Sequence, residues 1–210
     1  MGHYRRKDAT YHEAKKAGLR SRAGIKLEDL DARFRLLGSG KKVVDLGCWP
    51  GAWLQVAAAR VGARGLVVGV DLVAVEPLGL SNVVTIEGDV NDSAVQQRIL
   101  DALDGPADVV LCDLAPKLTG IRATDQAREE HLVETAIAFA ERVLAPGGSM
   151  LIKLFSTVEA SSVKRLRAGF RSATAYRPPS TRKGSSEIYA CATGRNAAPP
   201  PPPRAPEDLS

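Results

Sequence analysis

The chain of 210 residues is poor in cysteine and has no long hydrophobic run. Its three cysteines, Cys48, Cys112 and Cys191, are too widely spaced for a zinc motif or a disulfide framework. We therefore expect no metal site and a reducing, cytoplasmic compartment. No stretch of about 18 consecutive apolar residues occurs, so no membrane span is expected. The first residues also lack the apolar core of a secretory signal.

Two common nucleotide-binding patterns are missing as well. The glycine-containing segment "DLGCWPGAW" (45–53) is not followed by the Lys-Ser/Thr pair of a phosphate-binding loop. It also lacks the GxGxxG spacing that is typical of NAD-binding proteins, which argues against NAD. The segment does contain Gly47 and Gly51, and glycines at such a turn let the backbone approach a ligand closely.

Positive charge is concentrated at the N-terminus. The whole chain has a formal net charge of +5, and residues 1–26 contain eight basic and two acidic residues, a balance of +6. The remainder of the chain therefore carries −1. We interpret residues 1–20 as a flexible basic arm that suits a polyanion such as nucleic acid. A solvated, frayed terminus is the alternative.

Strand and helix signals alternate along the rest of the chain. Strands are predicted at 42–47, 66–72, 82–90, 107–114 and 149–155, helices at 21–37, 52–62, 93–103, 124–144 and 158–169, and two final strands at 173–178 and 187–193. This order predicts an α/β protein with a mostly parallel, doubly wound sheet of about seven strands and one antiparallel edge strand.

The domain limits follow from composition. The chain is 44% hydrophobic, which is enough for one ordinary globular core, and we place a single domain at residues 21–194. Residues 195–210 include five consecutive prolines and are predicted to be a disordered tail.

Acidic residues stand at the carboxyl ends of several predicted strands. Asp71 stands at the end of the second predicted strand, Asp89 at the end of the third and Asp113 at the end of the fourth. In open α/β sheets the ligand lies beyond these ends. An acidic residue about 20 positions after a glycine loop can accept hydrogen bonds from ribose hydroxyls, and Asp71 has this spacing from Gly51. The pattern favours an adenosine-type cofactor.

With these motifs in order, the sequence resembles the FtsJ-like (RrmJ-type) ribosomal RNA ribose 2′-O-methyltransferases. The resemblance covers about residues 21–194 and rests on "SRAGIKL", "VVDLGCWPGAW", "VDL", "EGDV", "CDLAP", "LAPGGSMLIKLF" and "SSEIYACATG". It implies a Rossmann-like fold and S-adenosyl-L-methionine as cofactor. The catalytic positions that match are Lys26, Asp113, Lys153 and Glu187. The cofactor positions that match are Gly51, Trp53, Asp71, Asp89 and Asp113, to which the glycine loop adds Gly47.

The implied reaction is methylation of a uridine 2′-hydroxyl in large-subunit (23S-type) ribosomal RNA. Lys153 stands in an apolar strand, where an unpaired lysine is rare, and we expect it to be the general base. We expect Asp113 to orient it, and Lys26 with partial burial to favour its neutral form. A monomer is expected to bind ribosomal RNA or the assembled large subunit through the basic arm and the Arg182/Lys183 loop.

Three alternatives remain open at this point. The chain could act on transfer RNA, or it could be a non-catalytic RNA-binding factor in ribosome assembly. A cytosine-C5 methyltransferase with Cys112 as nucleophile is the third, although a small core cysteine is the better interpretation of Cys112. The cofactor loop also departs from the family pattern, because Trp49 precedes Pro50 and Ala52 replaces a glycine.

Overall fold

Seven strands form one sheet in the computed structural model of this chain, which describes residues 9–116, 119–181 and 185–197. The strand order is β3-β2-β1-β4-β5-β7-β6. The strands are β1 (Lys42–Leu46), β2 (Leu66–Asp71), β3 (Val83–Glu87), β4 (Ala107–Cys112), β5 (Leu144–Phe155), β6 (Phe170–Tyr176) and β7 (Glu187–Arg195). The helices in the described part are α1 (Ala9–Lys16), α2 (Ala23–Phe34), α3 (Ala52–Val61), α4 (Ser93–Leu103), α5 (Arg122–Val143) and α6 (Glu159–Gly169).

The mostly parallel sheet is confirmed. Strands β3, β2, β1, β4 and β5 pair in parallel, while β7 pairs antiparallel with both β5 and β6. The antiparallel strand is therefore second from the edge, and β6 occupies the edge itself. The reason lies in the connections. Helix α6 carries the chain two strand positions beyond β5, and the connection after β6 returns β7 into the position between β5 and β6.

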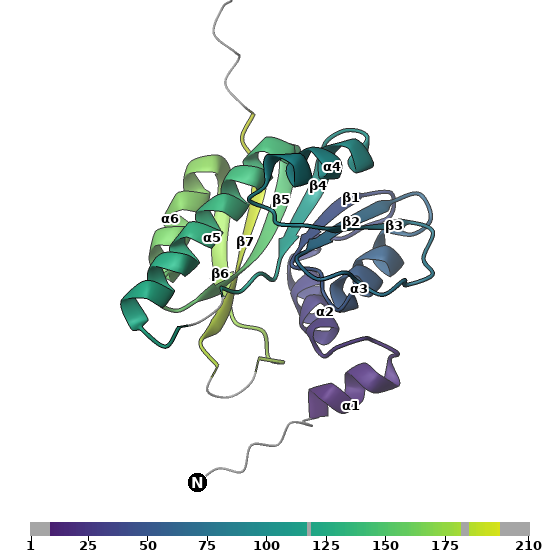
Figure 1. Ribbon diagram of the computed structural model, residues 1–210, viewed down its shortest axis with the longest axis horizontal. Coiled ribbons are helices and arrows are strands. Elements are labelled where there is room, and N and C mark those ends of the chain that lie inside the picture. Colours follow the sequence, from purple (N-terminus) through teal and green to yellow (C-terminus); the bar gives the residue numbers. More distant parts are fainter. Residues whose placement is uncertain (1–8, 117–118, 182–184, 198–210) are drawn as a thin grey trace, which may run out of the picture.

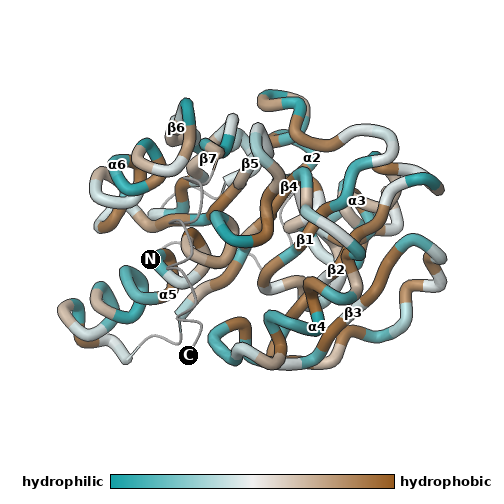
Figure 2. Tube along the Cα trace, turned by 90° about the horizontal axis from the view of Figure 1, so that it is seen from above, coloured by the Kyte–Doolittle hydropathy of each residue, from teal (hydrophilic) through white to brown (hydrophobic). Residues whose placement is uncertain are grey.

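Helices cover both faces of the sheet, and each face has its own core (Figure 1). Leu27 and Leu30 of α2 and Leu54 of α3 belong to the core on one face. Ile99 of α4 and Ile137 of α5 belong to the core on the other. In Figure 2 the strands at the middle of the sheet are coloured largely as hydrophobic. Burial on both faces explains why the central strands are apolar along most of their length.

Several element boundaries differ from the prediction. Helix α2 ends at Phe34, three residues early, because Arg35 adopts a left-handed conformation with φ of 53°. Strand β5 begins at Leu144 rather than at 149, and its pairing with β4 is irregular between Ala107 and Val109. Residues 9–16, which lie in the arm expected to be flexible, form helix α1 next to α2 (Figure 1). Residues 198–210 of the Pro-rich tail lie outside the described residues.

The carboxyl ends of the parallel strands meet at one edge of the sheet. The antiparallel β7 begins at this same edge, because Glu187 is the register partner of Phe155 at the end of β5. Segments from β1, β2, β3, β4, β5 and β7 thus converge there, and α2 closes the same end through contacts with α3. Among the described residues, no helix combines the length and apolarity that crossing a bilayer requires.

Candidate active site

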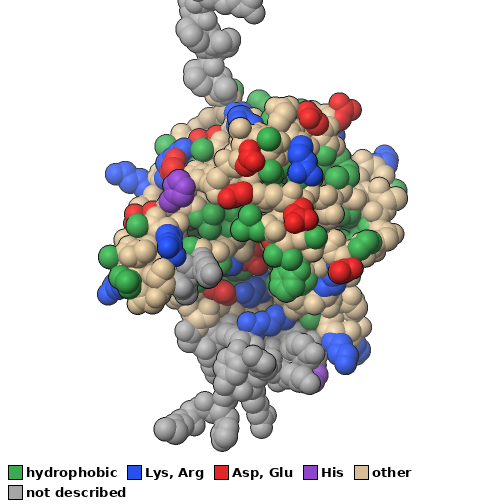
Figure 3. Space-filling model, in the orientation of Figure 1, with side chains coloured by type: hydrophobic (Ala, Val, Ile, Leu, Met, Phe, Trp, Pro, Cys, Tyr) green, Lys and Arg blue, Asp and Glu red, His purple; other side chains and the backbone are tan. Residues whose placement is uncertain are grey.

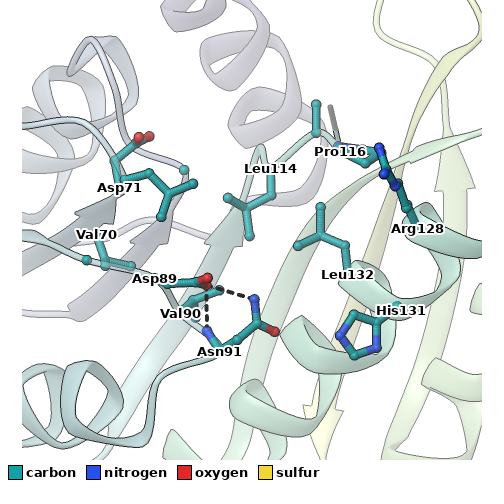
Figure 4. A pocket seen from close by; sticks show the side chains of 14 residues that line it. Val70, Asp71, Asp89, Val90, Asn91, Leu114, Pro116, Arg128, His131 and Leu132 are labelled. Atoms are coloured by element: carbon teal, nitrogen blue, oxygen red, sulfur yellow. Dashed lines mark hydrogen bonds between the residues drawn. The ribbon is translucent and has the colours of Figure 1, made fainter. Parts of the chain in front are cut away.

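A cavity of about 330 Å³ opens at this edge between the strand ends and α5 (Figure 4). Asp71 and Asp89 lie on the side of the strands, and Arg128 and His131 extend from α5 on the other side. The cavity is lined by Gly47, Val70, Asp71, Leu72, Gly88, Asp89, Val90, Asn91, Leu114, Ala115, Pro116, Arg128, His131 and Leu132. Apolar walls with a few polar groups are typical of a site for a small organic ligand.

Gly47 allows the wall of the cavity to form. Its φ is +83°, a conformation that strains other residues, and a Cβ atom there would lie 2.9 Å from Cδ2 of Leu114. The loop after β1 therefore packs directly against the segment after β4. This close approach explains why the sequence needs a glycine at position 47.

Both acidic residues of the cavity have fixed carboxylates. The amides of Trp49 and Val73 donate to the two oxygens of Asp71 over 2.9 and 3.0 Å. The Asn91 amide and side chain donate to Oδ1 of Asp89 over 2.9 and 2.7 Å. A carboxylate has about four lone-pair sites, so each can accept further hydrogen bonds from a ligand.

Two lysine–carboxylate pairs lie at the same edge of the sheet, and one of them includes Asp113, next to the cavity-lining Leu114. Lys26 Nζ of α2 is 2.6 Å from Oε2 of Glu187. Lys153 Nζ of β5 is 3.1 Å from Oδ1 of Asp113 and donates to the Asp113 carbonyl oxygen over 2.7 Å. Each lysine side chain is only 9% exposed. The four predicted catalytic residues, which come from separate parts of the chain, are thus brought together in two nearly buried ion pairs.

Tyr189 connects the two pairs. Its hydroxyl donates to Oδ1 of Asp113 over 3.0 Å, and its ring centroid lies 5.8 Å from Nζ of Lys26. Tyr189 is fully buried and is the register partner of Lys153. The sequence reasoning missed this residue. Its position two residues after Glu187 was an available signal, since residues i and i+2 of a strand share one face.

The charges around Glu187 keep it ionised. Burial acts to raise its pKa, but the hydrogen bond and charge of Lys26, with the charges of Lys153 and Arg22, outweigh burial and lower it. The pKa of Tyr189 is raised by burial and by the charges of Asp113 and Glu187, so its hydroxyl stays protonated. This cluster therefore contains two carboxylate acceptors, two amines and one phenolic donor.

Comparison with known proteins decides the family. The family model described as FtsJ-like methyltransferase matches residues 19–195, which is most of the chain. The chain belongs to the FtsJ-like methyltransferase family.

Relatives and solved structures agree with this assignment. The protein named Ribosomal RNA large subunit methyltransferase E of Methanobrevibacter smithii is 42% identical over 183 residues, covering 87% of each chain. A crystal structure of a candidate ribosomal RNA methyltransferase of Plasmodium falciparum has a TM-score of 0.76 and 26% identity, covering 85% of this chain and 100% of that one. A candidate methyltransferase of Streptococcus mutans in complex with S-adenosylhomocysteine shares the fold, with a TM-score of 0.53, 17% identity, and coverage of 81% and 97%.

S-adenosylmethionine is the methyl donor of this family, and the residues of the site suit it. Asp71 and Asp89 offer acceptors for the hydroxyl groups of an adenosine. Asp45 of β1 is fully buried, and neither of its carboxylate oxygens has a hydrogen-bond partner among the described residues. The acids Asp45, Asp71 and Asp113 are close enough for their charges to interact. Such an acidic group favours a ligand that carries an ammonium and a sulfonium.

Three residues that the resemblance assigned to the cofactor, Gly51, Trp53 and Asp113, do not line the cavity, although Asp113 directly precedes the lining residue Leu114. Trp53 is 3% exposed, and its indole Nε1 donates to the Ala23 carbonyl over 2.7 Å. Gly51 is the N-cap residue of α3 with φ of 108°. The structure thus places Trp53 between α3 and α2, and Gly51 at the turn that ends the glycine loop. Their contact with the cofactor remains a prediction.

Arg20 clamps this loop to the segment after β2. Its guanidinium donates to the carbonyl oxygens of Pro50, Glu76 and Pro77 over 3.0, 2.6 and 2.8 Å. Its own amide donates to Gln55 Oε1 of α3 over 2.8 Å. Arg20 is the last residue of the basic arm that was predicted to bind RNA, and these bonds use it to hold the backbone of the cofactor site.

The structure opposes a cysteine nucleophile in this methyltransferase. Cys112 is 2% exposed and lies in the core, and burial raises its pKa to about 12. Burial also raises the pKa of Cys191 to about 12. Because the thiolate is the reactive form, neither residue is suited to attack a pyrimidine at neutral pH.

Substitution of Arg20 tests the clamp. We expect Arg20→Ala to weaken S-adenosylhomocysteine binding by roughly tenfold, because hydrogen bonds from a charged donor are worth about 1.5–3 kcal/mol. Isothermal titration calorimetry measures this. The control Lys16→Ala removes one exposed positive charge of α1 and should leave the affinity unchanged. An Arg20→Ala protein that binds the cofactor product normally but binds RNA poorly would contradict the clamp.

The buried Asp45 should make the stability of the protein depend on pH. Burial, followed by the charges of Asp113 and Asp71, raises its pKa well above the ordinary 3.8. The unfolded chain therefore loses this proton at lower pH than the folded chain does. As the pH rises above about 4, the free energy of unfolding of the wild type decreases, because the folded chain still has to bind the proton. In the cofactor-free protein, the melting temperature of Asp45→Asn should increase relative to wild type between about pH 5 and pH 8. Parallel melting curves across this range would exclude the raised pKa.

Proposed function

We propose that this methyltransferase transfers the methyl group of S-adenosylmethionine to a ribose 2′-hydroxyl of large-subunit ribosomal RNA, with a uridine as the target. One observation carries the proposal: the Lys153–Asp113 pair adjoins the cofactor cavity through Leu114, and Tyr189 connects this pair to the Lys26–Glu187 pair. The names of the relatives support the choice of ribosomal RNA.

The consecutive residues Asp113 and Leu114 link the site of the methyl donor to the proposed base, Lys153. Leu114 lines the cavity, and the preceding Asp113 holds Lys153 through both its carboxylate and its carbonyl oxygen. A change in this segment would move the cavity wall and the base together. This arrangement suits an in-line transfer, which requires the attacking hydroxyl and the methyl group to be held in one geometry.

In the proposed mechanism, Lys153 in its neutral form accepts the proton of the 2′-hydroxyl. S-adenosylmethionine supplies an electrophilic methyl group on a sulfonium. Asp113 orients the Lys153 amine, and Tyr189 holds the Asp113 carboxylate. Glu187 fixes Lys26, whose ammonium is placed to favour negative charge developing on the ribose oxygen.

A lysine suits the role of base better than either carboxylate. Glu187 has a lowered pKa and is already paired with Lys26, so it is a weak base. Asp113 accepts hydrogen bonds from Lys153 and Tyr189. Of these groups, the neutral amine binds a proton most strongly. The division of roles therefore follows from the contacts: the acids orient and the amine transfers the proton.

The RNA is proposed to reach this site along the basic arm. Lys15 and Lys16 are exposed at the end of α1, and the chain then runs through Arg20 and Arg22 into α2, which carries Lys26. Arg182 and Lys183, which were predicted to grip phosphates, lie outside the described residues. Phosphate contacts of this kind fix the position of the RNA without reading its sequence.

Two substitutions of Lys153 test its role as base. We expect Lys153→Ala to reduce the single-turnover methyl-transfer rate by about 10²–10⁴-fold, the usual contribution of a general base. The matched variant Lys153→Arg keeps a positive charge next to Asp113, but its guanidinium cannot lose a proton at neutral pH. It should be as slow as Lys153→Ala. A Lys153→Arg enzyme that retains most of the rate would show that charge, rather than proton transfer, is what position 153 supplies.

The substrate and the reaction are tested together with tritium-labelled S-adenosylmethionine. Assembled large subunits, free ribosomal RNA and transfer RNA from a strain that lacks the gene are offered separately. We expect label in the large-subunit RNA, at a uridine whose 3′ phosphodiester resists alkaline cleavage, because a methylated 2′-oxygen cannot attack the phosphate. Label in transfer RNA alone would favour that alternative substrate. Absence of label, despite cofactor binding, would favour a non-catalytic assembly factor.

A further inference from the structure

An exposed tryptophan stands in the loop after β1, where the function described above does not use it. Trp49 is 56% exposed, although tryptophan is on average a well-buried residue. Two further exposed apolar side chains are close in the fold: Leu72 at 68% and Val73 at 53%. Asp71 ties them together, since its carboxylate accepts the amides of both Trp49 and Val73. These three apolar residues are named here the Trp49 patch.

Neither the core nor the cofactor cavity explains the exposure of Trp49. The other tryptophan, Trp53, differs from Trp49 because it is only 3% exposed and its indole nitrogen is hydrogen-bonded. The cavity wall includes Gly47 and Leu72, but it does not include Trp49. The backbone of Trp49 is nevertheless held firmly by its bond to Asp71. A large aromatic ring is thus presented to the outside from a fixed backbone.

Basic residues approach the Trp49 patch, next to the acidic Asp71 and Glu76. The next residue, Pro50, accepts a hydrogen bond from Arg20, the residue that leads from α1 to α2. Exposed Lys15 and Lys16 end α1, and α2 carries Lys26. On the face drawn in Figure 3, green hydrophobic side chains in the region that α2 and α3 occupy in Figure 1 border both blue Lys and Arg and red Asp and Glu side chains. The loop of Trp49 contacts the cavity-lining Asp71 through the Trp49 amide, and it contacts Arg20 at the end of the basic arm through the Pro50 carbonyl.

Single-stranded RNA is a suitable ligand for an aromatic ring that lies near cationic side chains. Recognition of RNA commonly uses unstacked bases that stack on aromatic side chains, while basic groups hold the phosphates. A ribose buried at a catalytic lysine also requires that its nucleotide leave the neighbouring stack. A base released in this way needs a new flat apolar contact, and the exposed ring of Trp49 offers one.

We propose that Trp49 is a stacking platform for a base of the RNA substrate, either the target nucleotide or its immediate neighbour. This inference rests on the proposed function only in taking RNA as the substrate. Leu72 and Val73 extend the apolar surface, and Lys15 and Lys16 contact phosphates. The platform positions the RNA and takes no part in proton transfer.

Fluorescence tests the proposal, because Trp49 and Trp53 are the two tryptophans of the chain. The emission of wild type minus that of Trp49→Phe reports Trp49. We expect a 12-nucleotide oligouridylate to quench this difference signal, and an abasic ribose-phosphate oligomer of equal length to leave it unchanged. Trp49→Ala should bind the oligouridylate about tenfold more weakly, as for the loss of one base–aromatic stack, and Trp49→Phe should lose less.

Two controls separate stacking from other roles. Val84→Ala trims an exposed apolar side chain near the start of β3, away from the carboxyl edge of the sheet, and should leave RNA affinity unchanged. Trp49→Ala should bind S-adenosylhomocysteine within about twofold of wild type, since the ring does not line the cavity. Weaker cofactor binding with normal RNA affinity would overturn the proposal in favour of a cofactor cover. Unchanged affinity for both ligands would also overturn it.

Different experimental results would contradict the stacking platform and the proposed function. If Trp49 is quenched by RNA but the methylated product is cleaved by alkali, the platform stands and the 2′-hydroxyl assignment is wrong. If ribose methylation proceeds and Trp49→Ala binds both the oligouridylate and a large-subunit RNA transcript normally, the platform is wrong and the function stands. A wild-type protein that binds neither RNA would overturn both.

Discussion

The pairing of two nearly buried ammonium groups with two carboxylates is the constraint on which the site depends. Removing a charge from water is unfavourable unless a partner of opposite charge and hydrogen bonds compensate it. Lys26 meets this condition through Glu187, and Lys153 meets it through Asp113. Tyr189 lies between the pairs and contacts a member of each. The four ionised residues come from α2, β5, β7 and the segment after β4, so their pairing also fixes these elements relative to one another.

The strand order makes this pairing possible. Inserting the antiparallel β7 beside β5 puts the N-terminal end of β7 next to the carboxyl end of β5. Glu187 and Tyr189 therefore face the same edge as the loops that surround the cofactor cavity. A parallel strand in that place would present its carboxyl-terminal residues instead. The basic segment before α2 then joins the edge through Arg20, which ties the entrance of α2 to the glycine loop.

Much of the fold could be predicted, because its signals are local. Alternating strand and helix signals predicted the parallel strands. Lys153 was predicted to be functional because an unpaired lysine is rare in an apolar strand. Other features depended on packing across the sheet. Trp53, predicted to contact the cofactor, has its indole bonded to the Ala23 carbonyl at the start of α2, and its contact with the cofactor stays a prediction. Arg20 belongs to the arm predicted to bind RNA, and its guanidinium donates to three carbonyl groups.

By itself, the sequence determined the α/β alternation, the residue types at the strand ends and the charge of the N-terminal arm. These properties follow from periodicity and composition, which need no knowledge of which segments are neighbours. Only the tertiary structure decided that Tyr189 bridges the two ion pairs, that Asp45 is buried with no hydrogen-bond partner in the described part of the chain, and that Trp49 is exposed while Trp53 is not. Burial and hydrogen bonding are set by residues distant in the chain, and no local pattern records which of them will meet.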